Sequence, residues 1–389
     1  MQAVGTTYPG GTWGLYRDGE LVPGGGEPLE VTDKYRGTPW ARVDGAAPAD
    51  LDAAVAGARR ALSRPIPPRT RRDILLRAAS ILAARREELA RGIVKEAGKP
   101  YKDAFVEVGR AIDTFTLAAE EAPRIAGEMV PVEAAPGSED RLAFTLRVPV
   151  GVVAAITPFN FPINLVAHKV APALAAGNAV VLKPASTTPV TSLRLAGILA
   201  EAGLPPGYLQ VVTGSGGAIG DRLVEHPGVN LITFTGSGDV GRRITQRAGL
   251  RRVCLELGNN SPVLVLADAD LERAAAAVST GGFLSAGQKC ISVQRVIVEA
   301  AVYDRFRDAL VARVAALKTG DPDDPDTDVG PMISEREAER AEAWVRAAVE
   351  GGARLLVGGR REGPVLYPTL LEDVRPDMAV VCQEIFAPV

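Results

Sequence analysis

The sequence is poor in the side chains that build metal centres and disulfide frameworks. Among 389 residues it has two histidines and three cysteines, and it has no Cys-x-x-Cys pair. So few imidazole and thiolate ligands argue against zinc chemistry. Three cysteines give no disulfide framework either, which is typical of proteins in a reducing cytoplasm. We therefore expect no bound metal and a cytoplasmic location.

Long apolar runs and an excess of either charge are missing as well. The net charge is −3 at pH 7, so the chain lacks the basic excess with which proteins bind nucleic acids or anionic lipids. Its apolar stretches, such as residues 148–156, are too short to span a bilayer. The N-terminus shows no basic segment followed by an apolar one, so no signal peptide is indicated. We expect neither a nucleic-acid nor a membrane partner.

What is present is the composition of a globular enzyme, with 47% hydrophobic and 23% charged residues. A length of 389 residues predicts two domains. After an N-terminal region of strands and turns, amphipathic helical patterns cover residues 48–63, 69–97 and 101–122. Residues 129–148 form two extended runs around a Pro-Gly turn, which predicts a β-hairpin.

The region from residue 150 to residue 257 alternates buried strands with helices, and a second alternation follows residue 259. This pattern predicts an α/β fold with a parallel sheet covered by helices. Ligands bind such sheets at the carboxyl ends of the strands. The residues expected at those ends are Thr157 to Asn160, Lys183, Thr235, Gly236 and Glu256.

Cys290 follows Gly287-Gln288-Lys289 in a loop between a helical pattern and a strand. A thiol flanked by a lysine and by loop amides can have its thiolate favoured and act as a nucleophile. The alternative is a small buried hydrophobic side chain, which is the common role of a free cysteine. For Cys254 and Cys382, which lie in apolar runs, we expect that buried role.

The other candidates also have two interpretations each. Glu256 at a strand end is a general base or an ordinary charged end residue. Asn160 offers an amide to an oxyanion or belongs to a rigid turn. Lys183 pairs with ribose or phosphate, or is solvated. The glycines from Gly236 onward open a helix and suit a phosphate, but they match neither a P-loop nor a GxGxxG fingerprint.

Six ordered motifs together resemble the aldehyde dehydrogenase superfamily. They are TPFNFP (157–162), VVLKPAS (180–186), FTGSGDVG (234–241), LELGNN (255–260), GQKCIS (287–292) and EIFAPV (384–389). The resemblance implies oxidation of an aldehyde to a carboxylic acid with hydride transfer to NAD or NADP. It makes Cys290 the nucleophile, Asn160 an oxyanion donor and Glu256 the base for thioester hydrolysis.

The resemblance also implies the domains and the cofactor contacts. It divides the chain into an NAD(P)-binding Rossmann-type domain (1–128 and 149–258), an oligomerisation hairpin (129–148) and an α/β catalytic domain (259–389). The implied cofactor-binding residues are Thr157, Pro158, Phe159, Lys183, Ser186, Gly236, Ser237, Val240, Leu257, Gly258, Glu384 and Phe386.

Three positions depart from the family pattern. Ser186 stands where many NAD-preferring relatives have a glutamate, and losing that carboxylate favours NADP. Asn259 replaces a glycine of ELGG and Ala387 a glycine of EIFGPV. We expect both changes to leave cofactor binding intact.

Several alternatives remain open at this stage. Relatives continue past EIFGPV, so we expect a shortened catalytic domain, and a weakly active nucleotide-binding protein is one alternative. An acyl-CoA-forming enzyme is another, which Glu256 opposes. The sequence around Cys290 resembles branches of the family that act on lactaldehyde, glycolaldehyde, phosphonoacetaldehyde or glyceraldehyde 3-phosphate. The family forms dimers or tetramers, so we expect a homo-oligomer.

Overall fold

A seven-stranded sheet organises the first part of the chain. The computed structural model describes residues 8–389. Its strand order is β12-β11-β8-β9-β10-β2-β3, in which the five strands from β12 to β10 are parallel and β2 and β3 are antiparallel additions. The strands are β2 (Leu15–Arg17), β3 (Glu20–Val22), β8 (Val152–Ile156), β9 (Ala179–Lys183), β10 (Leu209–Val211), β11 (Leu231–Thr235) and β12 (Arg252–Glu256). The predicted Rossmann-type parallel sheet is confirmed.

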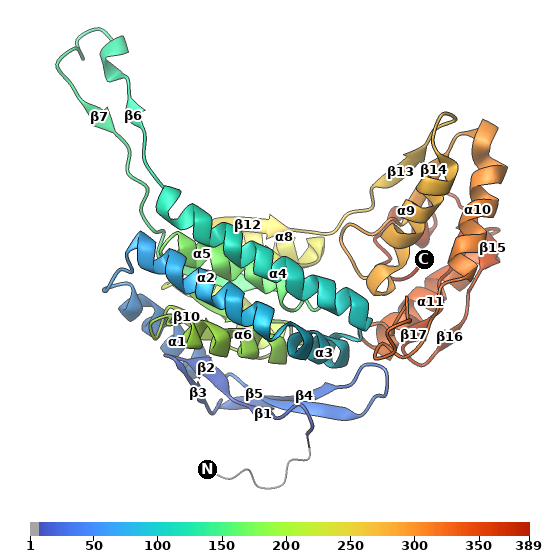
Figure 1. The fold of residues 1–389 in the computed structure, drawn as a ribbon, viewed down its shortest axis with the longest axis horizontal. Coiled ribbons are helices and arrows are strands. Elements are labelled where there is room, and N and C mark those ends of the chain that lie inside the picture. Colours follow the sequence, from blue (N-terminus) through green and yellow to red (C-terminus); the bar gives the residue numbers. More distant parts are fainter. Residues whose placement is uncertain (1–7) are drawn as a thin grey trace.

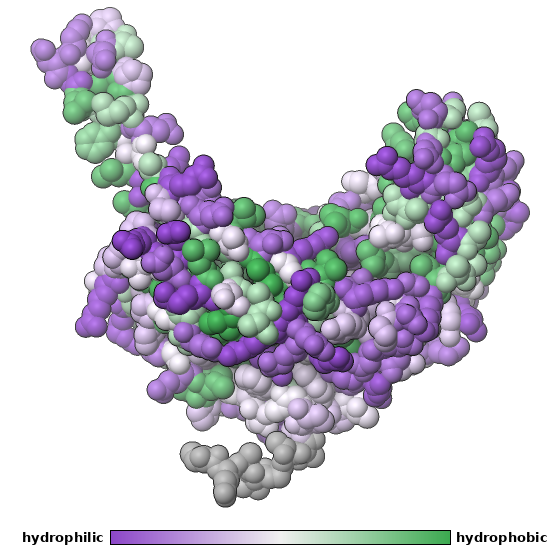
Figure 2. Space-filling model, viewed as in Figure 1, coloured by the Kyte–Doolittle hydropathy of each residue, from purple (hydrophilic) through white to green (hydrophobic). Residues whose placement is uncertain are grey.

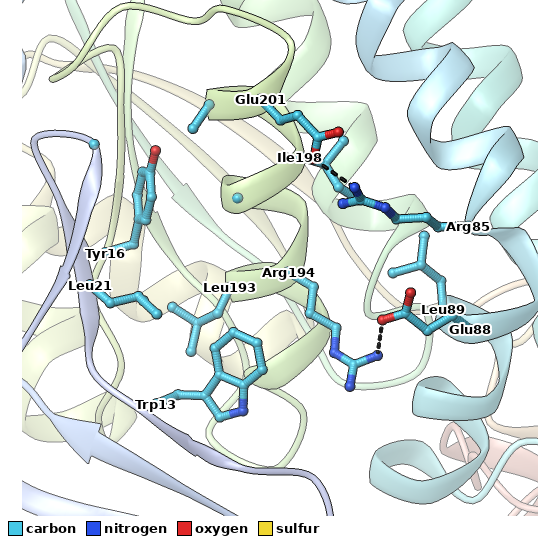
Figure 3. A pocket seen from close by; sticks show the side chains of 13 residues that line it. Trp13, Tyr16, Leu21, Arg85, Glu88, Leu89, Leu193, Arg194, Ile198 and Glu201 are labelled. Carbon is cyan, nitrogen blue, oxygen red and sulfur yellow. Dashed lines mark hydrogen bonds and ion pairs between the residues drawn. The ribbon is translucent and has the colours of Figure 1, made fainter. Parts of the chain in front are cut away.

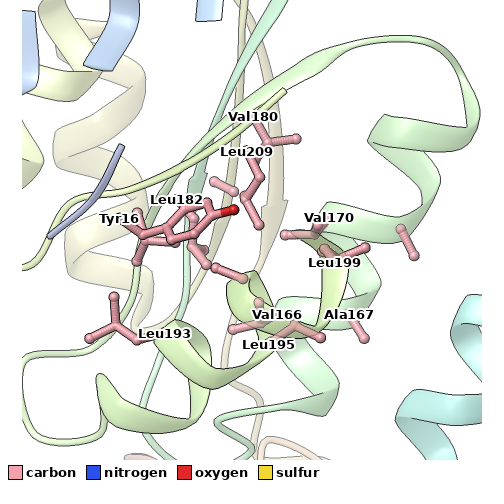
Figure 4. Packing of buried hydrophobic residues seen from close by; sticks show 14 of the residues in the cluster. Tyr16, Val166, Ala167, Val170, Val180, Leu182, Leu193, Leu195, Leu199 and Leu209 are labelled. Atoms are coloured by element: carbon pink, nitrogen blue, oxygen red, sulfur yellow. The ribbon is translucent and has the colours of Figure 1, made fainter. Parts of the chain in front are cut away.

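Helices cover this sheet because each has one apolar face to bury. They are α1 (Pro48–Ala61), α2 (Pro68–Ala84), α3 (Arg86–Ala97), α4 (Tyr101–Glu121), α5 (Asn164–Ala175), α6 (Val190–Glu201), α7 (Asp221–Glu225) and α8 (Gly238–Arg247). Helices α5 and α6 pack on the strands, and α2 and α4 pack outside them (Figure 1). Figure 4 shows how Val166, Val170, Leu182, Leu199 and Leu209 interlock in this core.

The position of the sheet's switch point follows from the strand order. From β8 the chain proceeds outward through β9 to β10, and it then returns to the other side of β8 with β11 and β12. The carboxyl ends of β8 and β11 therefore border the crevice in which such sheets bind ligands. Thr157 and Gly236 directly follow these two strands.

The second half of the chain forms a separate lobe (Figure 1). Its helices are α9 (Leu271–Phe283), α10 (Tyr303–Ala315), α11 (Glu335–Glu350) and α12 (Ala379–Cys382). Its strands are β13 (Pro262–Val265), β14 (Arg295–Val298), β15 (Arg354–Val357), β16 (Arg361–Glu362), β17 (Val365–Leu366) and β18 (Leu370–Glu372). The buried hydrophobic residues form two clusters, one between residues 15 and 248 and one between 265 and 387.

Two smaller elements complete the fold. A three-stranded sheet of β1 (Thr12–Trp13), β5 (Pro39–Gly45) and β4 (Gly26–Thr32) lies near the N-terminus. The predicted hairpin is present as β6 (Met129–Val130) paired antiparallel with β7 (Ala143–Phe144), and it projects from the body (Figure 1). Within residues 8–389, no helix is long and apolar enough to cross a membrane.

Charged pairs connect the two lobes. Arg36 donates to Asp321 and Asp323, with N–O distances of 2.6 and 3.0 Å, and Lys95 also donates to Asp323. At the second residue of α4, Lys102 pairs with Asp328. The acidic segment that precedes α11 is thus held against the ends of α3 and α4, so the two lobes meet beside the start of α4.

The structure corrects three expectations of local structure. The single helix over residues 69–97 is two helices, because the backbone breaks at Arg85 (φ −104°, ψ 18°) and the acidic residues Glu87 and Glu88 suit a new helix N-terminus. The strand expected to follow the Cys290 loop directly, from Ile291, begins only at Arg295, as β14. Cys254 and Cys382 are exposed rather than buried, and for Cys254 the reason is that β12 is an edge strand.

Candidate active site

The Cys290 loop has an unusual backbone. Ser285, Ala286 and Gly287 have φ values of 55°, 53° and 66°, three consecutive residues in the left-handed region. That conformation costs a non-glycine residue roughly 1–2 kcal/mol. At Gly287 a Cβ would overlap the carbonyl oxygen of Ala387, so this position requires glycine. The loop is therefore held in a costly conformation, which is common at functional sites.

The Cys290 thiol is half-buried, and its environment disfavours the thiolate. Burial is the main cause that raises its pKa, and the nearby carboxylates of Glu384 and Glu256 raise it further. The N–H groups of Cys290 and Ile291 partly oppose this effect. The expectation that Lys289 and the loop amides favour the thiolate is therefore wrong for the resting protein, because burial and the two carboxylates outweigh the amides.

Asn160 joins the Cys290 loop directly. Its Nδ2 donates to the Gln288 carbonyl oxygen over 2.8 Å, two residues before the cysteine. The side chain is buried, and its Oδ1 has no hydrogen-bond partner among the described residues. An amide nitrogen has two hydrogens, so one N–H stays available beside Cys290. The structure thus brings Asn160 and Cys290 to one place.

Glu256 is the exposed last residue of β12, and Asn259, also exposed, lies three residues further along the chain. The Asn259 Nδ2 donates to the carbonyl oxygen of Cys290. The Glu256 charge acts on both Cys290 and the buried Lys169. From the sequence Asn259 was a departure from glycine without a role of its own. The structure shows that its side chain links the end of β12 to the cysteine loop.

Glu384 and Phe386, near the C-terminal end of the sequence, lie beside residues 159 and 258. The Phe386 ring meets Phe159 edge-on, with 6.0 Å between ring centroids. A Cβ on Gly258 would overlap the Glu384 carboxylate, so glycine is required for this approach. The carboxylate accepts the N–H of Asn259, its Oε1 is buried without a partner among residues 8–389, and burial raises its pKa. Phe159, Glu384 and Phe386, all predicted cofactor-binding residues, thus lie close together.

Lys183 is 4% exposed at the end of β9. Its ammonium donates to the Pro184 carbonyl oxygen over 3.1 Å, and it forms no ion pair in the described part of the chain. Burial lowers its pKa to about 8. Nearby, the Ser186 hydroxyl donates to the Gly214 carbonyl oxygen over 2.9 Å. The interpretation of Lys183 as a solvated surface charge is excluded.

Helix α8 begins at the predicted glycine segment. The Ser237 Oγ accepts the Val240 N–H over 3.4 Å and thereby caps the helix. Val240 and Leu257 are large hydrophobic residues that stay 43% and 37% exposed, and Leu257 packs on Gly241. Gly236 packs tightly on the Phe234 ring. The arrangement leaves an apolar surface beside a helix N-terminus.

These residues fit a dinucleotide. A helix N-terminus suits a diphosphate, and the apolar surface of Val240 and Leu257 suits an adenine. Lys183 is a buried cation without a carboxylate, and Glu384 and Thr157 each hold a buried oxygen without a partner in residues 8–389. Buried polar groups in proteins are normally satisfied, so such atoms indicate a ligand that supplies the missing partners.

A separate surface pocket of about 470 Å³ lies between β2, α6 and the start of α3 (Figure 3). Its two arginines are already paired, Arg85 with Glu201 at 2.7 Å and Arg194 with Glu88 at 3.2 Å. It contains none of the predicted site residues, so it does not contribute to the candidate active site.

The chain is similar to known proteins over most of its length. The family model described as "Aldehyde dehydrogenase family" matches residues 21–389. The 3-sulfolactaldehyde dehydrogenase of Priestia aryabhattai is 52% identical over 376 residues, which is 97% of this chain and 79% of that protein. The lactaldehyde dehydrogenase of Methanocaldococcus jannaschii is 44% identical, over 83% of this chain and 69% of that protein.

Solved structures show the same fold. The NADP-dependent glyceraldehyde-3-phosphate dehydrogenase of Bacillus halodurans, complexed with NADP, superposes with a TM-score of 0.94 at 39% identity. The superposition covers 97% of this chain and 80% of that one. The chain therefore belongs to the aldehyde dehydrogenase family. It is an oxidoreductase that converts an aldehyde to a carboxylic acid with NAD or NADP as the hydride acceptor, as the sequence predicted.

Proposed function

We propose that this enzyme oxidises a short 2-hydroxyaldehyde that carries an anionic group, and that 3-sulfolactaldehyde is the leading candidate. The observation that carries the proposal is 52% identity to a 3-sulfolactaldehyde dehydrogenase over 97% of the chain. Other relatives act on lactaldehyde and on glyceraldehyde 3-phosphate, which are also short and polar. All three substrates have a hydroxyl beside the aldehyde.

Positive charge near the cysteine supports an anionic substrate. Lys289 directly precedes Cys290, and its pKa is lowered to about 8, mainly by burial; the charge of Asp103 opposes this shift, and those of Lys99 and Arg110 add to it. Arg110 is exposed on α4 and forms no ion pair in the described part of the chain. At neutral pH these cations favour a sulfonate or phosphate group beside the thiol.

The proposed chemistry starts with the thiol. Because its pKa is raised, the Cys290 thiol first releases its proton to solvent water. The thiolate then attacks the aldehyde carbon, and the new S–C bond replaces the carbonyl π bond to give a thiohemiacetal oxyanion. The free N–H of Asn160 and the backbone N–H of Cys290 hold the resulting oxyanion. NAD(P)⁺, held by the residues named above, would supply the hydride acceptor. Glu256 then takes a proton from the water that hydrolyses the thioester.

We propose that the cofactor is held by the residues named above, with the ribose at Lys183 and Glu384. Ser186 presents a hydroxyl and no carboxylate, so nothing at this position repels a 2′-phosphate, and we propose that NADP is used at least as well as NAD. A higher kcat/KM with NAD than with NADP would contradict this proposal.

We also propose that the enzyme is a cytoplasmic homo-oligomer and that the hairpin contributes to its assembly. Large hydrophobic side chains of the hairpin and the chain after it are exposed, among them Met129 (67%), Phe144 (59%), Leu146 (74%) and Val148 (75%). Figure 2 shows hydrophobic surface, coloured green, on the projecting arm. Light scattering should give a dimer or tetramer for the wild type, and a monomer after Phe144→Asp and Leu146→Asp would support this role.

The substrate proposal is tested with a panel of aldehydes, by following NAD(P)H absorbance with and without coenzyme A. The panel compares 3-sulfolactaldehyde, lactaldehyde, glyceraldehyde 3-phosphate, hexanal and benzaldehyde. We expect kcat/KM for the sulfonate to exceed that for lactaldehyde by roughly 10- to 100-fold, the effect of one hydrogen bond to a charged group. Arg110→Gln should reduce this ratio, whereas Arg59→Gln, an exposed arginine on α1, should leave it unchanged.

Two results would contradict the proposal. Preferential turnover of hexanal or benzaldehyde would exclude a short anionic substrate. A requirement for coenzyme A would show acyl-CoA formation instead of hydrolysis to the acid. Cys290→Ala should abolish turnover of every aldehyde in the panel.

A further inference from the structure

One face of α4 carries two carboxylates that reach the two loops of the active site. Asp103 and Glu107 are four residues apart and therefore lie on the same side of the helix. In Figure 1, α4 runs along the first lobe, and its N-terminal end lies at the second. Neither carboxylate was a candidate from the sequence, where both belong to the ordinary polar pattern of an amphipathic helix.

Glu107 holds the segment that follows Asn160. It is buried, and its Oε1 accepts the backbone N–H groups of Ile163 and Asn164 over 3.0 and 3.2 Å. Its Oε2 pairs with the buried Lys99 ammonium at 2.5 Å. That ammonium lies 3.6 Å from the centroid of the Phe161 ring, immediately after Asn160. The first turn of α5 and the loop before it are thus fixed to α4 by a fully buried pair.

Asp103 holds the loop that carries the nucleophile. Its Oδ2 accepts the backbone N–H of Ser285 over 3.1 Å. Ser285 is the first of the three residues with left-handed backbone, so this bond stabilises the loop where its conformation is costly. The bond also crosses from the first lobe to the second. Asp103 does not contact Cys290 and acts on it through the loop.

The two loops meet above the same helix face. Asn160 donates to the Gln288 carbonyl oxygen over 2.8 Å, and a small cavity at this junction is lined by Asn160, Ser285 and Gln288 among others. An α-helix fixes the spacing of its carboxylates, because four residues span about 6 Å of a rigid element. A shift of either loop would therefore change the distance between the Asn160 amide and the Cys290 N–H.

We propose that Asp103 and Glu107 are positioning residues for the oxyanion site, which they assemble by fixing the Asn160 loop and the Cys290 loop to one helix. This inference rests on the roles of Cys290 and Asn160 in the proposed function. It assigns to α4 the task of setting the distance between two donors that belong to different lobes. A misplacement of about 1 Å at such a site costs on the order of 100-fold in rate.

The test uses Asp103, because it is only partly buried and its variants are expected to fold. Asp103→Ala should lower kcat by roughly 10- to 100-fold, with the Kd of NADP⁺ and the melting temperature close to wild type. Asp103→Asn keeps an oxygen that accepts the Ser285 N–H, so it should restore most of kcat. Asp113→Ala, an exposed carboxylate on the same helix, is the control and should leave kcat unchanged.

A second measurement separates positioning from general stability. In an Asn160→Ala background, Asp103→Ala should cost much less than in the wild type, because both changes impair one oxyanion site. Glu107→Gln retains the oxygen that accepts the Ile163 and Asn164 N–H groups but leaves the buried Lys99 ammonium unpaired, so it should lower both kcat and the melting temperature.

The outcomes distinguish this inference from the proposed function. If Cys290→Ala retains activity, the proposed function fails. If Cys290→Ala is inactive but Asp103→Ala keeps wild-type kcat, or if the effects of Asp103→Ala and Asn160→Ala are additive, the positioning role is overturned. Loss of activity in Asp103→Ala that Asp103→Asn does not restore also overturns it.

Discussion

Replacing the buried Lys183 by methionine should stabilise the free protein and weaken cofactor binding. The lysine is 4% exposed and has no carboxylate partner in the described part of the chain, and burial lowers its pKa from 10.5 to about 8. This difference corresponds to roughly 3 kcal/mol of unfavourable free energy for the charged side chain at neutral pH. Methionine has a similar length and no charge, so Lys183→Met removes that cost.

The expected stabilisation depends on pH. Because folding lowers the pKa of Lys183, the free-energy cost of burying it is absent above pH 10.5, where the amine is neutral in both the folded and unfolded states. The cost grows as the pH falls and is complete below about 8, where the buried amine is also protonated. The variant should therefore melt above the wild type at pH 7, by on the order of 5 °C, and the two should converge as the pH approaches 10. Thermal unfolding followed by circular dichroism between pH 7 and 10 measures this difference.

Cofactor affinity should change in the opposite direction. If Lys183 meets the cofactor ribose or phosphate, Lys183→Met should raise the Kd of NADP⁺ by at least roughly tenfold, the effect of one charge-assisted hydrogen bond. Lys34→Met is the matched control, since burial also lowers the pKa of Lys34 to about 8, but Glu96 and Asp33 lie nearby. It should leave the Kd of NADP⁺ unchanged, because Lys34 is not among the predicted cofactor contacts, although it too should raise the melting temperature at pH 7.

Two results would refute this reasoning. A lower melting temperature for Lys183→Met at pH 7 would show that the ammonium has a stabilising partner. An unchanged Kd for NADP⁺ would show that the buried cation serves no cofactor contact.

Three further predictions concern the cysteine loop. Gly287→Ala places a Cβ against the Ala387 carbonyl oxygen at a residue whose φ is 66°. The melting temperature and kcat should therefore both fall. A kcat near that of the wild type would contradict the strained backbone of this loop. Asn259→Gly removes the amide that donates to the Cys290 carbonyl, so kcat should fall several-fold at constant Kd for NADP⁺, as steady-state kinetics and fluorescence titration would show. Because the pKa of Lys289 is about 8, the lysine loses its charge above pH 8, so KM for an anionic aldehyde should rise there. Lys289→Met should have a high KM that does not change with pH. A pH-dependent KM in this variant would assign the effect to another group.

The sheet and most of its strands were predictable because each strand is a short run of residues with a recognisable local pattern. The runs of residues 152–156 and 179–183 are apolar and buried on both faces, and the glycine segment after β11 opens a helix as predicted. The motif residues at the strand ends followed from the same pattern. The hairpin was predictable because two extended runs flank a Pro-Gly turn.

Contacts between distant parts of the chain were not predictable in the same way. The pKa of Cys290 depends on burial and on Glu384, which comes close only after the second lobe folds. The bonds from Asp103 to Ser285 and from Asn160 to Gln288 join segments that have no shared local pattern. Cys254 is exposed because its strand, β12, forms the edge of the sheet. The apolar sequence of a strand does not show where that strand lies in the order of the sheet.

We propose that Cys290 carries the substrate as a thioester and that Glu256 is the base that releases it. This proposal is tested most directly by mixing Glu256→Gln with NADP⁺ and 3-sulfolactaldehyde, followed by absorbance and by mass spectrometry of the peptide that contains Cys290. We predict a burst of about one NADPH per active site, then very slow turnover, and an acyl group on Cys290, because hydride transfer proceeds while hydrolysis lacks its base. Steady turnover at the wild-type rate, or a burst with Cys290 unmodified, would contradict the account.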